Sequence, residues 1–217
     1  MEYIYLSFSK ELKAIMTNKK MFIIAIIAYF FILFGAIRSA DLLSEYGIQS
    51  HLAIMNLASM MIVAQFMPMV FYLELKNGLL NVFIANMKFL KIIFIRLLFY
   101  FLLHISAVIF YAFIMYFFRR FMILNSSYKI IFELFLIGTN CLISLIVPVL
   151  IKEEMLSYYV AGFSALLIDW AYLYLLDFYN KSLTSFISVL PAIIIFFVLF
   201  FVALYLVRNI TKFMKNH

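Results

Sequence analysis

The sequence predicts an all-α membrane protein with six transmembrane helices, and three observations carry this prediction. Of 217 residues, 68% are hydrophobic and 12% are charged, too few charges to cover a soluble domain of this size. The apolar residues fall into six blocks, and a helix needs roughly 20 such residues to cross a bilayer core. The blocks lack strand alternation, and a helix satisfies its backbone polar groups within its own segment.

Residues 1–20 precede the first block, and we expect them to form an amphipathic helix on the membrane surface. Apolar side chains recur there at helical spacing, at Tyr5, Phe8, Leu12, Ile15 and Met16. Polar side chains lie between them, at Ser9, Lys10, Glu11 and Lys13. Such a helix places its apolar face against the acyl chains. A solvated helical lead-in to the first crossing is the simpler alternative.

The six predicted crossings follow in order within a single domain, residues 1–217. They cover residues 21–37, 52–73, 92–118, 130–151, 155–176 and 183–207. Pro68, Pro148 and Pro191 lie inside the second, fourth and sixth crossings. Each proline lacks the N–H that a helix uses, so each can bend its helix.

Lysine and arginine are unevenly distributed between the two sides of this arrangement. Most of them lie before the first crossing, between the second and third, and after the sixth. The positive-inside rule therefore places both termini in the cytoplasm. Abundant Ile, Phe, Lys, Asn and Tyr favour a bacterial source, so we expect a multi-pass protein of the bacterial cytoplasmic membrane. We assign the net charge of +7 to orientation and lipid contact, not to nucleic acid.

The cytoplasmic segment between the second and third crossings, residues 74–91, is amphipathic. Its apolar face consists of Leu75, Leu79, Val82 and Phe83. Its polar groups are Lys76, Asn77, Asn81, Asn86 and Lys88. This pattern predicts an interfacial helix that offers one face to a cytosolic partner.

Glu74 ends the second crossing, and Gly78, the amphipathic stretch, a basic residue and a long third crossing follow. This order resembles the permease subunits of type-2 ABC exporters, in which the segment is the coupling helix that contacts the ATP-binding subunit. The stretch Phe8-Ser9-Lys10-Glu11-Leu12-Lys13 is similar to the connecting helix of that family. Asn86-Met87-Lys88 departs from the Pro, Ser and basic residue of many members. The implied ATPase contacts are Glu74, Lys76, Asn77, Gly78, Asn81, Phe83, Asn86 and Lys88.

The resemblance also implies partners. It implies a second permease subunit, identical or different, and a separate cytosolic ABC ATPase that holds ATP and Mg. The glycines of this chain lack the spacing of a phosphate-binding P-loop, so we expect no cofactor and no ATP hydrolysis in the chain itself. The implied activity is export of an amphipathic or hydrophobic cargo, such as an antimicrobial peptide, a toxin, a drug or a lipid-like molecule.

Polar side chains inside the predicted crossings are the remaining candidates for function. Charge within lipid is costly, so Asp169, His104 and Gln65 are candidates for a translocation path. The alternative for these residues is pairing with neighbouring helices. Asn56, Gln65, Thr139 and Asn140 can hydrogen-bond between helices.

Two further charged residues have simpler expected roles. We expect Glu133 to pair with Arg119, Arg120 or Lys129 across a short loop. Arg96, near the inner end of the third crossing, is expected to snorkel toward the headgroups.

Two other classes of function stay open. An intramembrane peptidase that processes a peptide needs a nucleophile and a base, and Cys141 with His104 is the available pair. As a lone cysteine, Cys141 excludes an internal disulfide and a cysteine metal cluster, and we expect no metal site. A non-enzymatic immunity or scaffold protein fits the composition equally well, but it leaves residues 74–91 without a role.

Overall fold

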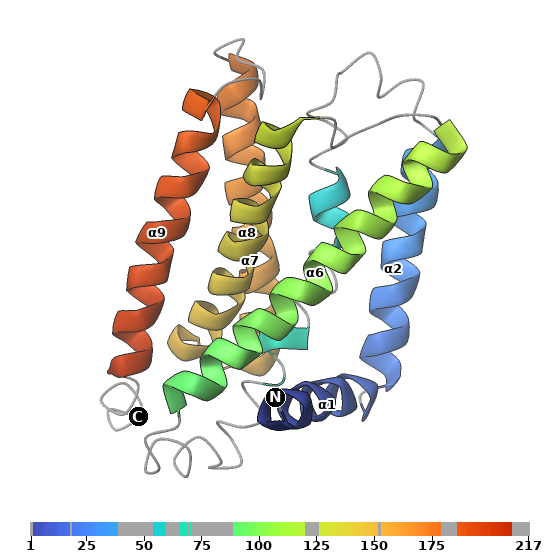
Figure 1. The fold of residues 1–217 in the computed structure, drawn as a ribbon. Coiled ribbons are helices and arrows are strands. Elements are labelled where there is room, and N and C mark those ends of the chain that lie inside the picture. Colours follow the sequence, from blue (N-terminus) through green and yellow to red (C-terminus); the bar gives the residue numbers. More distant parts are fainter. Residues whose placement is uncertain are drawn as a thin grey trace.

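The computed structural model describes residues 2–17, 19–38, 54–59, 66–68, 70, 89–119, 126–151, 153–178 and 186–209. Its helices are α1 (Glu2–Thr17), α2 (Lys19–Arg38), α6 (Phe89–Arg119), α7 (Ser127–Leu150), α8 (Glu154–Phe178) and α9 (Phe186–Arg208). Residues 54–59, 66–68 and 70 are also helical. No strand occurs in these described ranges. Figure 1 shows α2, α7, α8 and α9 running along the bundle, with α6 crossing it obliquely.

The structure confirms the predicted all-helical architecture, with several helices that can cross a membrane. Among the described residues, three helical segments are long and apolar enough to cross a bilayer: Ile93–Phe118, Ser127–Leu150 and Ile187–Leu206. The bent pair Phe8–Thr17 and Phe22–Arg38 brings the number to as many as four. Helix α8 contributes a shorter apolar stretch, Tyr159–Ala171. The helices α2, α6, α7, α8 and α9 coincide with the first, third, fourth, fifth and sixth predicted blocks.

Helix α7 is the central helix of the bundle. In its spanning segment 78% of the residues are buried, against 28% for the segment in α6 and 22% for that in α9. It packs against α6, α8 and α9. Its first turn is capped by Ser126, whose hydroxyl oxygen accepts a hydrogen bond from the Lys129 N–H at 3.3 Å. The buried polar side chains of α7, such as Glu133 and Asn140, must therefore find their partners within the protein.

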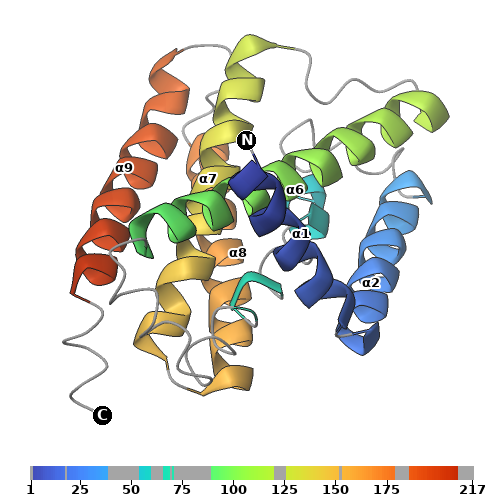
Figure 2. The ribbon, with the colours of Figure 1, turned by 60° about the horizontal axis from the view of Figure 1, so that its bottom comes forward.

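Helix α1 lies across one end of the bundle, as Figures 1 and 2 show. The axis turns by 89° between Phe8–Thr17 and Phe22–Arg38. Glu11 and Ile15 are buried, whereas Leu12 and Met16 are about half exposed, at 50% and 55%. The first turn of α6 and the last turn of α9 lie at the same end of the bundle as α1 (Figure 1). The helical prediction for the N-terminal segment is thus confirmed, with one face against the bundle.

Gly138 allows α9 to approach α7 closely. A Cβ atom added at Gly138 would lie 2.6 Å from Cε2 of Phe196, which is closer than real contacts allow. The Phe196 ring packs edge-on to Phe135 at 5.3 Å and stacks on Phe200 at 6.1 Å, so a shift of the ring away from the added methyl group disturbs both contacts. A small residue at a close helix contact is typical of membrane bundles.

We predict that Gly138→Ala destabilises the protein by about 1–3 kcal/mol, because the added methyl group overpacks this contact. The measurement is thermal unfolding of the purified chain in detergent. Gly35→Ala is the matched control, since nothing lies within 4 Å of a Cβ atom there. Equal unfolding midpoints for the two variants would contradict this account of the α7–α9 contact.

Candidate functional site: a polar network in the bundle and an ion pair at its end

The structure describes some of the predicted site residues and leaves others outside its described ranges. Residues 71–88 lie outside the described part of the chain, and so does residue 65. The predicted ATPase contacts Glu74, Lys76, Asn77, Gly78, Asn81, Phe83, Asn86 and Lys88, together with Gln65, therefore stay predictions. The other path candidates, Asp169 and His104, are described, and both are buried.

A chain of polar contacts links four helical segments in the middle of the bundle. On one side, Asn140 of α7 donates from Nδ2 to Asp169 Oδ2 of α8 at 3.1 Å. On the other, Asn56 donates from Nδ2 to Glu133 Oε1 of α7 at 3.3 Å. Glu133 and Asn140 are seven residues apart, so they lie on the same face of α7.

The network continues into α6 through Ser59 and His104. The Ser59 hydroxyl donates to the Met55 carbonyl at 2.8 Å, so its oxygen can accept from the His104 ring. His104 Nε2 lies 2.8 Å from this oxygen. With the Ser59 hydroxyl donating to the Met55 carbonyl, Nε2–H of His104 is the donor in this contact. His104 and Asp169 are both buried and both contact a polar side chain of another segment, and their place on a translocation path stays a prediction.

Several buried polar atoms around the network have no hydrogen-bond partner. Among the described residues, these atoms are Asn56 Oδ1, His104 Nδ1, Tyr111 Oη, Glu133 Oε2, Thr139 Oγ1, Asn140 Oδ1, Ser144 Oγ and Asp169 Oδ1. Three of them are hydroxyl oxygens, which donate as well as accept, so donors and acceptors are both left unmet. Buried polar groups are normally satisfied, and an unmet one costs about 1–3 kcal/mol. The network is therefore suited to hold water.

These contacts confirm one set of sequence predictions and correct another. Asn56 and Asn140 form hydrogen bonds between helices, as predicted. The predicted partners of Glu133 were basic residues near the loop, but the hydrogen bond to its Oε1 comes from Asn56. The short segment 54–59 brings this amide to α7, and no periodicity in the sequence indicates that approach.

The prediction that Arg96 snorkels toward the headgroups is wrong. Arg96 is 2% exposed, and its Nη2 atom lies 2.7 Å from Glu11 Oε1 of α1. Its Nε atom donates to the same oxygen at 2.8 Å. Glu11 lies three residues after Phe8 and four before Ile15, so it shares the face of α1 that packs on α6. This spacing indicated that Glu11 is buried, but its polar side chain favoured an exposed position in the sequence analysis.

The ion pair is enclosed by aromatic contacts that join α1 to α6. Phe8 packs edge-on to Phe99 with ring centroids 5.1 Å apart, and Phe99 packs against Tyr100 at 5.2 Å. The Tyr100 hydroxyl donates to Glu11 Oε2 at 3.4 Å. A buried ion pair needs such additional hydrogen bonds to offset the cost of removing both charges from water. The result is a junction of polar and aromatic contacts between α1 and the beginning of α6.

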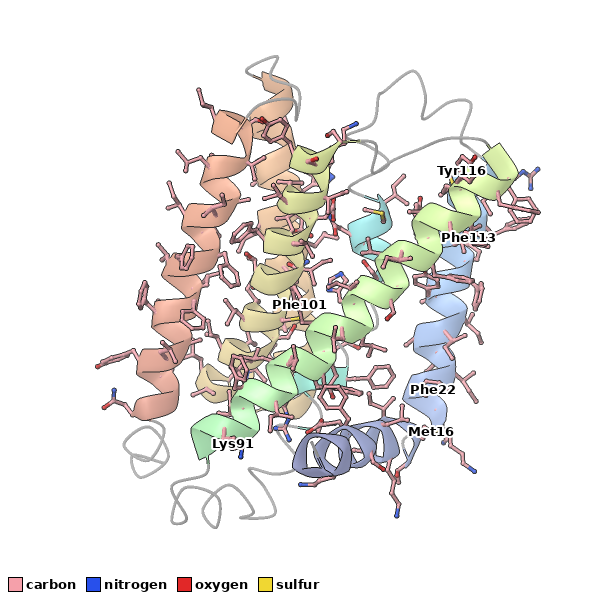
Figure 3. All side chains as sticks on the ribbon, in the orientation of Figure 1. Met16, Phe22, Lys91, Phe101, Phe113 and Tyr116 are labelled. Carbon is pink, nitrogen blue, oxygen red and sulfur yellow. The ribbon has the colours of Figure 1, made fainter. Side chains whose placement is uncertain are left out.

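An apolar groove lies between α6, α7 and α9. It consists of two adjoining hollows of about 180 Å³ and about 370 Å³. Both are lined by Phe94, Leu97, Leu142 and Phe200. Figure 3 labels two of the lining residues on α6, Lys91 at the lower end of the helix and Phe101 further up. The groove can hold an apolar chain, with a lysine at one end.

The pair that a peptidase would need lies in two different environments. Cys141 lines the apolar groove and belongs to a buried apolar cluster. His104 belongs to the polar network, where its Nε2 faces Ser59. Within the described ranges, no three His, Cys, Asp or Glu side chains are placed to hold a metal ion.

Comparisons of the chain with family models, with curated proteins and with solved structures give no match. The family resemblance accordingly enters below as a proposal.

We predict that replacing either partner of the buried ion pair is costly, because the remaining charge is left buried without its partner. Glu11→Gln and Arg96→Gln should each lower the free energy of unfolding by roughly 3–5 kcal/mol. The double variant should lose less than the sum of the two, a coupling that denaturation in detergent can measure. Lys13→Gln, an exposed change on the same helix, is the control. Strict additivity would show that the two side chains do not interact.

We predict that Asn140→Leu destabilises the bundle by about 1–3 kcal/mol, because Asp169 Oδ2 then loses its hydrogen-bond donor. Ser106→Ala is the control, since Ser106 is exposed and its hydroxyl donates to the Leu102 carbonyl of the same helix. The thermal midpoint of that control should stay near the unmodified value. An unchanged midpoint in Asn140→Leu would contradict the described contact.

Proposed function

We propose that this chain is the membrane-spanning subunit of an ATP-driven ABC exporter in the bacterial cytoplasmic membrane. One observation carries most of the support. The Glu11–Arg96 ion pair joins α1 to the beginning of α6. The resemblance assigns α1 to the connecting helix, and it places the coupling segment immediately before α6. The junction therefore lies, along the sequence, next to the segment that would receive force from an ATPase.

In this proposal the chain crosses the membrane six times, with both termini in the cytoplasm. The helices α2, α6, α7, α8 and α9 supply five crossings, and residues 52–73 supply the remaining one. The common location of α1, the first turn of α6 and the last turn of α9 agrees with this topology (Figure 1). A second permease subunit, identical or different, completes the transmembrane part.

The proposed mechanism follows from the junction. Closure of the ATPase subunits on ATP displaces residues 74–91, and α6 and α1 move together because the ion pair and the Phe8–Phe99 contact hold them. Helix α6 also carries His104 into the polar network and lines the apolar groove. Motion of α6 therefore alters both features at once. A groove with apolar walls and a lysine at one end supports an amphipathic or hydrophobic cargo.

The test is co-purification of the tagged chain, expressed in its own host, with a protein that carries a P-loop ATPase motif. Glu74→Ala and Gly78→Leu should each abolish capture of that ATPase, because both residues lie in the proposed contact. Glu153→Gln is the control, since Glu153 is exposed in the turn between α7 and α8, outside the proposed contact. Undiminished capture by the variants, or no ATPase with the unmodified chain, would refute the proposal.

A further inference from the structure

The apolar groove between α6, α7 and α9 opens on the outside of the bundle. Its floor consists of buried residues of α7, among them Leu142 at 3% exposed. At its rim, Phe94 of α6 is 64% exposed and Leu204 of α9 is 42% exposed. Each of the three helices carries a segment that is long and apolar enough to cross a bilayer. In a membrane the groove therefore faces the lipid.

The length of the groove matches the thickness of one lipid leaflet. Figure 3 labels Lys91 at the lower end of α6 and Phe101 further up the same helix, and both residues line the groove. They are ten residues apart, which is about 15 Å along the helix axis. One leaflet of a hydrocarbon core of about 30 Å has the same thickness. The larger hollow, about 370 Å³, lies within the size range of ligand-binding sites. These dimensions suit a fatty acyl chain.

The charge at the end of the groove selects the headgroup. Lys91 is exposed and lines the larger hollow, three residues before Phe94. Helix α9, which forms the other wall, ends at Arg208 at the same end of the bundle (Figure 1). In the described part of the chain, no carboxylate lines either hollow, and the lining residues other than Lys91 are apolar. A lysine at the end of a lipid-facing helix attracts anionic headgroups.

We propose that the groove binds one acyl chain of an anionic phospholipid, with the phosphate at Lys91 and the chain between Leu97 of α6 and Phe200 of α9. The bound lipid fills the space between α6 and α9 and covers the floor that α7 forms. A cargo that entered the groove would first have to displace this lipid. The inference itself rests on the groove and its charge, and it does not depend on the proposed exporter function.

The test is native mass spectrometry of the purified full-length chain in detergent, titrated with phosphatidylglycerol or with phosphatidylethanolamine of the same acyl chains. The unmodified chain should bind the first phosphatidylglycerol molecule more tightly than the first phosphatidylethanolamine molecule. Lys91→Gln should weaken the binding of phosphatidylglycerol by about 5-fold, the contribution expected of one lysine near anionic headgroups, and leave that of phosphatidylethanolamine unchanged. Lys13→Gln removes an exposed lysine of α1 and should change neither affinity.

A second variant tests the apolar part of the site. Leu97 lines both hollows, so Leu97→Trp fills the groove and should abolish tight binding of both lipids. Leu167→Trp is the matched control, since Leu167 is 49% exposed on α8 and does not line the groove. Circular dichroism shows whether each variant is folded. If Leu97→Trp does not fold, Leu204→Trp on the opposite wall takes its place, with the same expected result.

Three results would overturn the proposal. The first is an equal affinity of the unmodified chain for the two lipids. The second is a loss of phosphatidylglycerol binding in Lys13→Gln as large as that in Lys91→Gln, which means a general attraction to the basic surface. The third is undiminished lipid binding in a folded groove-filling variant. If that variant also converts an oligomer of the unmodified chain to a monomer, the groove is occupied by a second copy of the chain and not by lipid.

Discussion

The structure depends on one constraint: the polar face of α7 is buried, and its groups need partners on other helices. Asn56 and Asp169 contact polar side chains of α7, and His104 of α6 contacts Ser59, so α6, α8 and the segment 54–59 are positioned by polar contacts as well as by apolar packing. Apolar packing alone distinguishes poorly between helix orientations in lipid, because lipid tails are as apolar as leucine. The polar contacts therefore specify which faces of these helices meet.

The same reasoning applies at the end of the bundle. Helix α1 carries a glutamate and α6 carries an arginine, and each would be costly to bury alone. Together they form a short ion pair enclosed by Phe8, Phe99 and Tyr100. This pair joins α1, which lies across the end of the bundle, to the beginning of α6. The polar network is attached to the same helix at His104, so α6 connects the end of the bundle with its centre.

The helical part of the fold was predictable from the sequence, because long apolar blocks in lipid have few alternatives to a helix. The candidates Asp169 and His104 were also identifiable, since a buried charge or imidazole in such a block stands out. The partners were not predictable. Asn56 reaches Glu133 and Glu11 reaches Arg96 across 77 and 85 residues of sequence, and helical periodicity carries no information on such pairings. Glu11 was missed because its polarity outweighed its position beside Phe8 and Ile15.

The most direct test of the network is a chemical cross-link between α7 and α8, in a Cys141→Ala background. Asn140→Cys with Asp169→Cys should be bridged by a short thiol-specific bifunctional reagent, because the tips of the two native side chains are 3.1 Å apart. Asn140→Cys with Trp170→Cys should not, since Trp170 is 66% exposed and lies about 100° around α8 from Asp169. A thiol-reactive polymer, added after denaturation, counts the remaining thiols. Protection of the 140–169 pair alone is the predicted result, and protection of the 140–170 pair alone would contradict the arrangement of α7 and α8.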